Sequence, residues 1–137
     1  MDLPIGACQQ SAPGGTAYYD WTGIYNSSTT DPLYVDCGMQ FERDGDLFAA
    51  DDVASIVVFL FDQSTTADIV CTAKLVEYDG DVLYSGGQQS TSSSSSTVTG
   101  LGWSPAASWG LTYVGCKIPP KDGSQMSGIA GLYSMHH

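Results

Sequence analysis

Histidine is scarce in this 137-residue sequence, and its scarcity excludes several common kinds of catalytic site. The only two histidines, His136 and His137, are the last two residues, where they fit the start of a purification tag as well as native sequence. No internal histidine can act as the base of a Ser-His-Asp or Cys-His site, or join a histidine cluster around a catalytic metal. Glu42 and Glu77 are the only glutamates, so a glycosidase carboxylate pair is poorly supported as well. We therefore expect no catalytic residues, and an enzyme of unidentified class is a distant alternative.

Aspartates grouped around glycine offer the best candidate for a metal site. Two Asp-Gly-Asp triplets occur, at 44–46 and 79–81, and two further carboxylates follow the first triplet. Carboxylate oxygens around a flexible glycine suit Ca²⁺, although the order of residues is not that of an EF-hand. The candidate calcium ligands are Asp44, Asp46, Asp51 and Asp52. The alternative is that these are solvated turns, in which each aspartate bonds its own backbone, and that the protein has no cofactor.

Aromatic residues form the second informative group, with eight Tyr, three Trp and four Phe. Trp103 and Trp109 bracket a proline-containing loop, SPAAS, and Tyr113 falls on the same strand face as Trp109. Exposed planar rings can cover the apolar C–H faces of a sugar without any need for charge. Trp103, Trp109 and Tyr113 are therefore the candidate ligand-binding residues, and packing in the core is the alternative for the tryptophans.

The charge balance limits the class of partner. Fifteen acidic residues against four basic ones give a net charge of −11 and a pI near 4.1. Such a surface repels nucleic-acid phosphates and anionic lipid, so we expect no nucleic-acid partner. No apolar run approaches the roughly 20 residues that span a bilayer, so we expect no membrane insertion either. Polysaccharide or another neutral ligand is the partner that the composition favours.

Four cysteines, Cys8, Cys37, Cys71 and Cys116, lie 29, 34 and 45 residues apart. Their even number and the absence of a C-x-x-C pair favour two disulfides over a zinc or redox site. Of the three connectivities we favour Cys71–Cys116 with Cys8–Cys37, and buried free thiols are the alternative. Disulfides would place the protein outside the cytoplasm, secreted or periplasmic, with a signal peptide absent from this sequence. In a eukaryotic secreted protein, Asn26-Ser27-Ser28 would also be a glycosylation sequon.

The strongest strand signals lie at 53–78, where two apolar runs are joined by the polar turn QSTT. This pattern predicts a central antiparallel hairpin. The first run, 53–61, is apolar on both faces, so a second sheet, a loop or a partner chain must cover each face. Asp79-Gly80 predicts a further hairpin into a strand that begins at Val82, which would make three consecutive strands a meander.

Further strands are predicted at 17–26, 33–41, 97–103, 109–118 and 128–135, and no helix longer than a turn is expected. Residues 1–15 should be an extended tail before a single domain at 16–137. About eight antiparallel strands predict an all-β, single-domain β-sandwich of jelly-roll or Greek-key type. An immunoglobulin-like sandwich is the alternative.

Five short motifs follow one another along the chain. They are Cys8, the strand end GIYNSS at 23–28, the strand VDC at 35–37, the segment YVGCKIPP at 113–120 and the segment beginning SGI at 127–133. Their order resembles that of small secreted bacterial proteins of unknown function. The resemblance implies an extracytoplasmic, disulfide-linked β-sandwich, and it implies no activity.

These observations together predict a secreted, non-catalytic binding module for neutral carbohydrate. The alternative is a self-assembling or cell-surface structural protein, hence a homo-oligomer, because the 53–61 strand is apolar on both faces.

Overall fold

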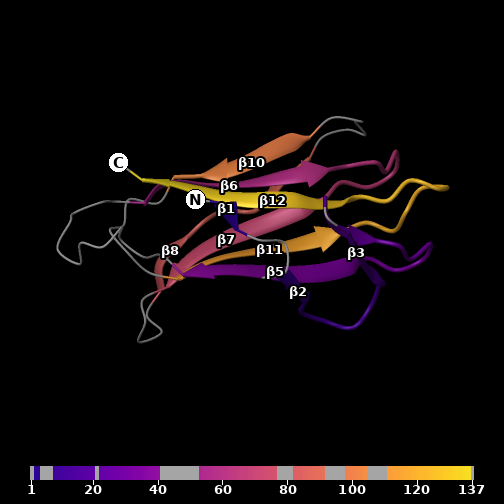
Figure 1. The fold of residues 1–137 in the computed structure, drawn as a ribbon, viewed down its shortest axis with the longest axis horizontal. Coiled ribbons are helices and arrows are strands. Elements are labelled where there is room, and N and C mark those ends of the chain that lie inside the picture. The colour runs from indigo at the N-terminus through magenta and orange to yellow at the C-terminus, as the bar shows by residue number, and fades with distance from the viewer. Residues whose placement is uncertain are drawn as a thin grey trace.

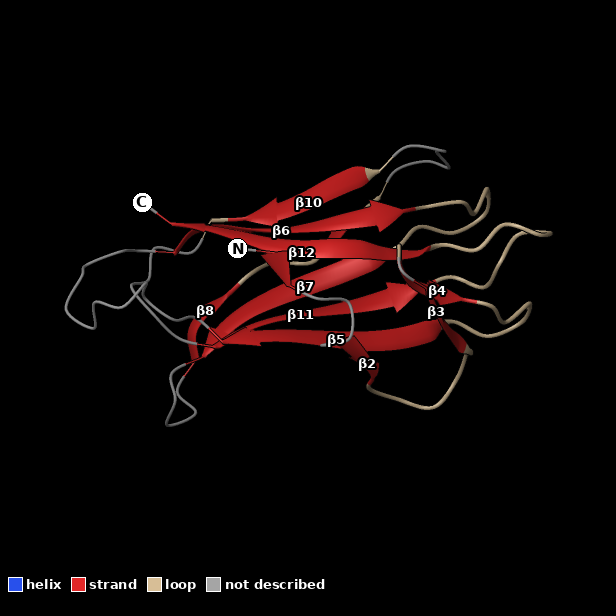
Figure 2. Cartoon of the chain, in the orientation of Figure 1, coloured by secondary structure: helices blue, strands red, loops and turns tan. Residues whose placement is uncertain are grey.

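The computed structural model describes residues 2–3, 8–20, 22–40, 53–76, 82–91, 98–104 and 111–136. The regular elements of this part of the chain are all β-strands, and they form two antiparallel sheets packed face to face (Figures 1 and 2). Within these residues there is no helix long and apolar enough to cross a membrane. The predicted all-β sandwich is confirmed.

Each sheet has six strands. The first sheet contains, in spatial order, β10 (Thr99–Trp103), β6 (Val53–Phe61), β12 (Gly128–His136), β4 (Gly23–Asn26) and β3 (Ala17–Asp20), with β1 (Asp2–Leu3) also paired to β12. The second sheet contains β2 (Cys8–Gln10), β5 (Leu33–Gln40), β11 (Leu111–Ile118), β7 (Val70–Val76) and β8 (Val82–Ser85), with β9 (Gln89–Ser90) also paired to β7.

The connectivity is that of a jelly roll. Eight of the strands can be numbered one to eight in chain order: β4, β5, β6, β7, β8, β10, β11 and β12. With this numbering the first sheet has the strand order 6-3-8-1 and the second has the order 2-7-4-5. Except for the pair β7 and β8, successive strands of this set pass back and forth between the sheets, as two interlocked Greek keys require.

The predicted hairpin at 53–78 is wrong, because β6 and β7 lie in different sheets. The connection between them, residues 62–69, crosses from one sheet to the other, whereas a hairpin loop has about two to five residues. Asp62 and Ile69 are fully buried on this connection. Thr91 fixes both, since its hydroxyl donates to the Asp62 carboxylate and accepts the Ile69 N–H at 2.9 Å. The predicted meander is thus reduced to the pair β7 and β8.

The segment predicted as one strand at 17–26 is a hairpin of two strands, β3 and β4. Asp20 makes the turn, because its carboxylate accepts the N–H groups of Thr22 and Gly23 at 2.7 and 3.1 Å. The hydrogen bond from the Thr22 side chain, followed by that from its backbone, holds the pKa of Asp20 below its usual value. The aspartate therefore ends the strand that the aromatic pattern alone would have continued.

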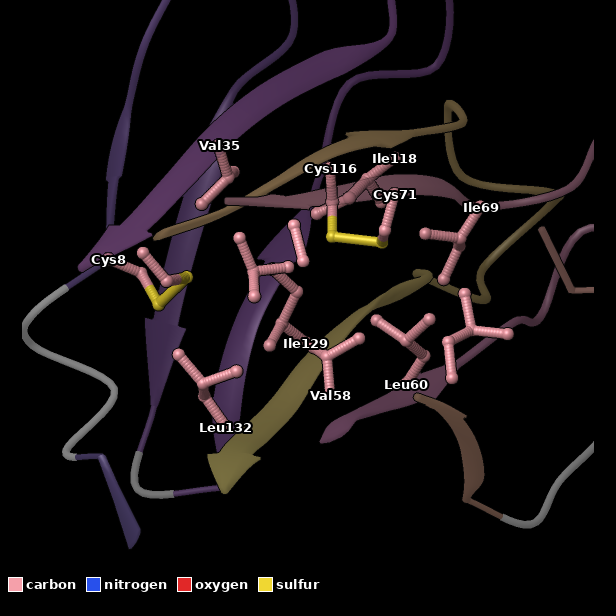
Figure 3. Close-up of a cluster of buried hydrophobic side chains, with 14 of the residues drawn as sticks. Cys8, Val35, Val58, Leu60, Ile69, Cys71, Cys116, Ile118, Ile129 and Leu132 are labelled. Carbon is pink, nitrogen blue, oxygen red and sulfur yellow. A yellow bond between two sulfur atoms is a disulfide. The ribbon is translucent and has the colours of Figure 1, made fainter. Parts of the chain in front are cut away.

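The core lies between the two sheets (Figure 3). On β6 the inward side chains are Ile56, Val58 and Leu60, all fully buried. The strand is also central in its sheet, between β10 and β12, as its apolar composition predicts.

Two disulfides lie in this core (Figure 3). They join Cys8 to Cys37 and Cys71 to Cys116, the pairs favoured from the sequence. Both are cross-strand bonds within the second sheet, between β2 and β5 and between β7 and β11. All four cysteines are buried. The apolar strand faces around Cys37, Cys71 and Cys116 predict this for those three, whereas Cys8 belongs to the segment predicted as a tail.

Asn26 connects the two sheets through its side-chain amide. The residue is fully buried, and its Oδ1 accepts the N–H groups of Thr16 and Ser28 at 3.3 and 3.0 Å. Its Nδ2 donates to the carbonyls of Ile118 and Pro119 at 3.2 and 3.1 Å, at the end of β11 in the other sheet. A glycan on Nδ2 is incompatible with this packing, so the sequon is not a glycosylation site of the folded protein.

Replacing Asn26 by alanine should lower the free energy of unfolding by about 2 to 3 kcal/mol, because it leaves buried backbone groups without partners. Urea unfolding followed by fluorescence measures this change. Thr29→Ala, at an exposed position of the adjoining loop, is the matched control and should change stability by less than about 0.5 kcal/mol. Equal midpoints for the two variants would show that the Asn26 amide does not hold the sheets together.

Candidate ligand-binding surface

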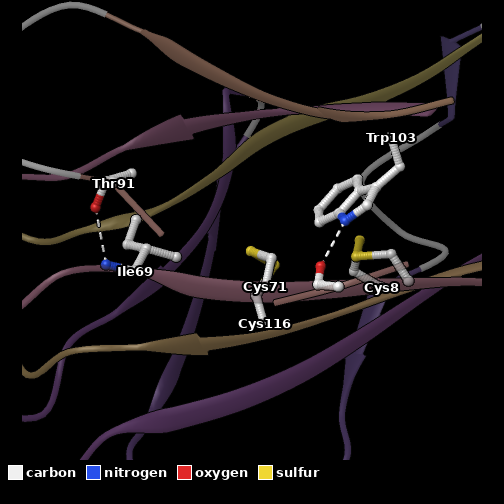
Figure 4. Close-up of a disulfide and its surroundings, with 8 residues drawn as sticks. Cys8, Ile69, Cys71, Thr91, Trp103 and Cys116 are labelled. Carbon is white, nitrogen blue, oxygen red and sulfur yellow. Dashed lines mark hydrogen bonds between the residues drawn. A yellow bond between two sulfur atoms is a disulfide. The ribbon is translucent and has the colours of Figure 1, made fainter. Parts of the chain in front are cut away.

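The three predicted ring-stacking residues do not form one surface. Trp103, on β10, is only 4% exposed and packs in the core, where its indole Nε1 donates to the Gly87 carbonyl at 2.7 Å (Figure 4). Gly86 admits the ring, since a Cβ there would lie 2.4 Å from Cδ1 of the indole. The core alternative therefore holds for Trp103, whose faces are not available to a ligand. Trp109 lies outside the described residues.

Tyr113 is the predicted residue that the structure places on the surface. It lies on β11 with its side chain on the outer face of the second sheet, 42% exposed. It pairs across the strands with Gly38 on β5. A Cβ at Gly38 would lie 3.2 and 3.3 Å from two carbons of the tyrosine ring, so one edge of the ring rests on the glycine backbone. The ring is thus positioned by the sheet and remains open to solvent.

Beside Tyr113, the outer face of the second sheet is hollowed into a shallow groove of about 340 Å³. Gly115 lies at its centre, paired with Asp36 on β5 and with Thr72 on β7. A Cβ at Gly115 would come within 2.8 Å of the Asp36 carboxylate and 4.0 Å of the Thr72 hydroxyl. The missing side chain therefore opens the groove and leaves these two polar groups as its flanks.

The remaining wall of the groove mixes aromatic, aliphatic and polar side chains. It includes Tyr34, Val70, Gln88 and Lys117. Tyr34 pairs with Lys117 across β5 and β11, so along the strands it lies beyond Gly115 from Tyr113. From Tyr113 to Lys117 the strand advances about 13 Å, at about 3.3 Å per residue. The face thus presents two tyrosines separated by hydrogen-bonding groups.

The charge of this face differs from that of the whole chain. The strands of the second sheet contain one acidic residue, Asp36, and two of the four basic residues, Lys74 and Lys117. The chain as a whole carries −11. A neutral ligand, or one with a weak negative charge, therefore meets no electrostatic barrier on these strands.

A second groove, of about 360 Å³, lies where the first sheet meets its connecting loops. Tyr25 and Phe61 form one wall, with their ring centroids 6.4 Å apart, and Gln63, Gln125 and Met126 complete it. The loops are tied together because Asp122 accepts the side-chain and backbone donors of Thr65. The side-chain hydrogen bond from Thr65 is the main cause that lowers the pKa of Asp122. The side chains that line this groove carry no charge, and two glutamines are its amide groups.

The candidate calcium ligands Asp44, Asp46, Asp51 and Asp52 lie outside the described residues, as do Asp79 and Asp81. Within the described ranges, no three His, Cys, Asp or Glu side chains gather closely enough to hold a metal ion. Calcium binding at 44–52 stays a prediction from the sequence.

No family model and no curated protein matches this chain. Solved structures do match. One is a carbohydrate-binding module, CBM36, in complex with calcium and xylotriose, with a TM-score of 0.50, 13% identity, and coverage of 98% of this chain and 99% of that chain. Another is the enzymatically active domain of tailspike protein 4 of bacteriophage CBA120, with a TM-score of 0.56, 5% identity, and coverage of 96% of this chain and 19% of that chain.

The likeness is one of fold. At 13% and 5% identity it places this chain among two-sheet β-sandwiches, in agreement with the strand order described above.

Proposed function

We propose that this protein is a non-catalytic module that binds neutral polysaccharide along the outer face of the second sheet. The proposal rests on the groove over Gly115, which Tyr34 lines, and on the exposed ring of Tyr113, two residues before Gly115 on the same strand. Because the groove is open, it suits the interior of a polymer as well as a chain end.

The chemistry of the groove supports a sugar ligand. A tyrosine ring covers the apolar face of a sugar, while carboxylate, hydroxyl and amide groups bond its hydroxyls. Asp36, Thr72 and Gln88 supply those polar groups within one groove. A shallow site buries little of its ligand, so the affinity should be modest. Since the ligand is neutral, binding should change little with ionic strength.

The fold neighbour gives independent support for the class of ligand. CBM36 is a carbohydrate-binding module whose structure contains calcium and xylotriose, which makes xylan the first polysaccharide to test. Calcium at Asp44, Asp46, Asp51 and Asp52 is proposed as a structural ion of the same protein. The two disulfides are typical of an oxidising compartment, which supports a secreted or periplasmic location.

Retention on insoluble xylan, cellulose and chitin tests the proposal. The wild type should be retained on at least one polymer at both low and high salt, and Tyr113→Ala should lower the retained fraction at least about fivefold, the loss of one good ring contact. Val82→Ala, an exposed position on β8 of the same sheet, is the matched control and should bind as the wild type does. Repeating the assay with EDTA and then with added Ca²⁺ tests the calcium proposal separately. Retention on none of the polymers would contradict the proposed function.

A further inference from the structure

The outer face of the first sheet carries an apolar ridge along β6, formed by Val57, Phe59 and Phe61. These side chains alternate with the buried core residues of the same strand, and Phe59 is 38% exposed. The sequence requires cover on both faces of this strand. The second sheet covers the inner face, and within the described residues the outer face keeps this exposed aromatic side chain.

Glycines border the ridge on both sides. On β10, Gly100 pairs with Phe59 and Gly102 with Val57, and on β12, Gly131 pairs with Phe59. Two successive outward positions of β10 therefore have no side chain. The two glycines of β10 therefore leave a shallow trough along one side of the ridge, and Gly131 leaves a gap beside Phe59 on the other side. The three strands lie side by side in Figure 1.

Among the residues that the structure describes, no neighbour requires these glycines. A Cβ at Gly100 would lie 3.5 Å or more from its nearest neighbours, at Gly102 3.6 Å, and at Gly131 4.0 Å, all ordinary van der Waals distances. Their φ angles are also not positive, unlike those of Gly14, Gly15 and Gly123. Glycine in the interior of a strand costs stability, and it often marks a place where another backbone or a ligand approaches closely.

The same face is free of formal charge over its central strands. The residues of β10, β6, β12 and β4 include no Asp, Glu, Lys or Arg, in a chain whose net charge is −11. Two copies of such a chain repel each other over most orientations. A charge-free face is where two copies can approach with the least repulsion.

We propose that a second copy of this chain packs on this face, with the β6 ridge of each copy lying in the β10 trough of the other. A ridge beside a trough is self-complementary under a two-fold axis, which is the condition for an isologous dimer. Facing sheets pack about 10 Å apart with interdigitated side chains, so the missing side chains of Gly100 and Gly102 make room for Phe59 of the partner.

The size of the face predicts a weak dimer. Five strands about 4.8 Å apart and about 20 Å long give roughly 500 Å² per copy. Stable interfaces bury about 800 Å² per partner, so this one should dissociate on dilution.

Sedimentation velocity over a concentration series tests the proposal. The average mass should rise from 14.4 kDa at low concentration towards twice that value, about 28.8 kDa, at high concentration. Phe59→Lys places a charge on each facing surface and should keep the mass at 14.4 kDa throughout. Val82→Lys, at an exposed position of the second sheet, is the control and should dimerise as the wild type does.

Gly100→Thr separates an interface from a structural role. A Cβ at position 100 makes only ordinary contacts within one copy, and threonine favours β-strands. The free energy of unfolding of the variant should therefore equal or exceed that of the wild type, while dimerisation should be lost. A wild type that stays monomeric at every concentration would overturn the proposal, and so would dimers that survive both Phe59→Lys and Gly100→Thr. Both variants should keep their polysaccharide retention. If Phe59→Lys and Gly100→Thr lose polysaccharide retention, the outer face of the first sheet binds the ligand and the dimer proposal fails. If only Tyr113→Ala loses retention, the ligand binds on the second sheet and the dimer proposal is unaffected.

Discussion

Replacing Trp103 by alanine should lower the free energy of unfolding by about 3 to 5 kcal/mol, the usual range for deleting a buried tryptophan side chain. The indole ring is 4% exposed and packs directly against the Gly86 backbone. Its removal therefore leaves a cavity between β10 and Gly86. The variant also leaves the Gly87 carbonyl without the indole donor at 2.7 Å. Urea unfolding measures the change from the shift in midpoint.

Two further variants decide between a core and a ligand-binding role. Trp103→Phe keeps an aromatic ring and should recover part of the loss, while Tyr113→Ala, on the exposed face of the other sheet, should cost less than about 1 kcal/mol. If Trp103→Ala unfolds at the wild-type midpoint and fails to bind polysaccharide, the indole faces the ligand and its placement in the core is contradicted.

Removing the Cys71–Cys116 disulfide by changing both cysteines to alanine should cost about 4 kcal/mol. The bond closes a loop of 45 residues, and in the chain-entropy model a loop of this length restricts the unfolded chain by that amount. The bond also lies in the core, so the truncation leaves a small void that adds to the loss. Comparison of urea midpoints for the wild type and the double variant measures the effect.

Intact mass after alkylation under non-reducing, denaturing conditions is the control for this experiment. The wild type should add no alkyl group, and the double variant should add none either, since Cys8 and Cys37 remain bonded to each other. Addition of four groups to the wild type would show free thiols, and the predicted stability difference would then have no basis.

Strand identity could be predicted from the sequence because burial imposes a period of two, and β5 and β7 show that period clearly. Strand pairing could not. The crossing of residues 62–69 between the sheets depends on Thr91, which lies 29 residues after Asp62, and no local pattern indicates that contact. A polar turn between two apolar runs is therefore consistent with a hairpin and with a jelly-roll crossing alike.

The candidate site shows the same limit. Tyr113 could be proposed as a surface ring because it shares a strand face with Trp109, whereas the groove near it depends on the strand register that aligns Asp36, Gly115 and Thr72. A glycine such as Gly115 does not by itself predict a groove, because the groove also depends on which residues pair with it on the neighbouring strands. For Trp103 a signal was present, because it shares a strand face with Leu101 while glycines occupy the other face.

A titration of ¹⁵N-labelled protein with short oligosaccharides of xylan, cellulose and chitin, followed by the amide chemical shifts, would locate the polysaccharide-binding surface. If polysaccharide binds on the second sheet, the largest changes should fall on β5, β11 and β7 around Asp36, Gly115 and Thr72, and Tyr113→Ala should reduce them. Changes confined to the groove of Tyr25, Phe61, Gln63 and Gln125, or no changes with any of the three sugars, would contradict binding on the second sheet.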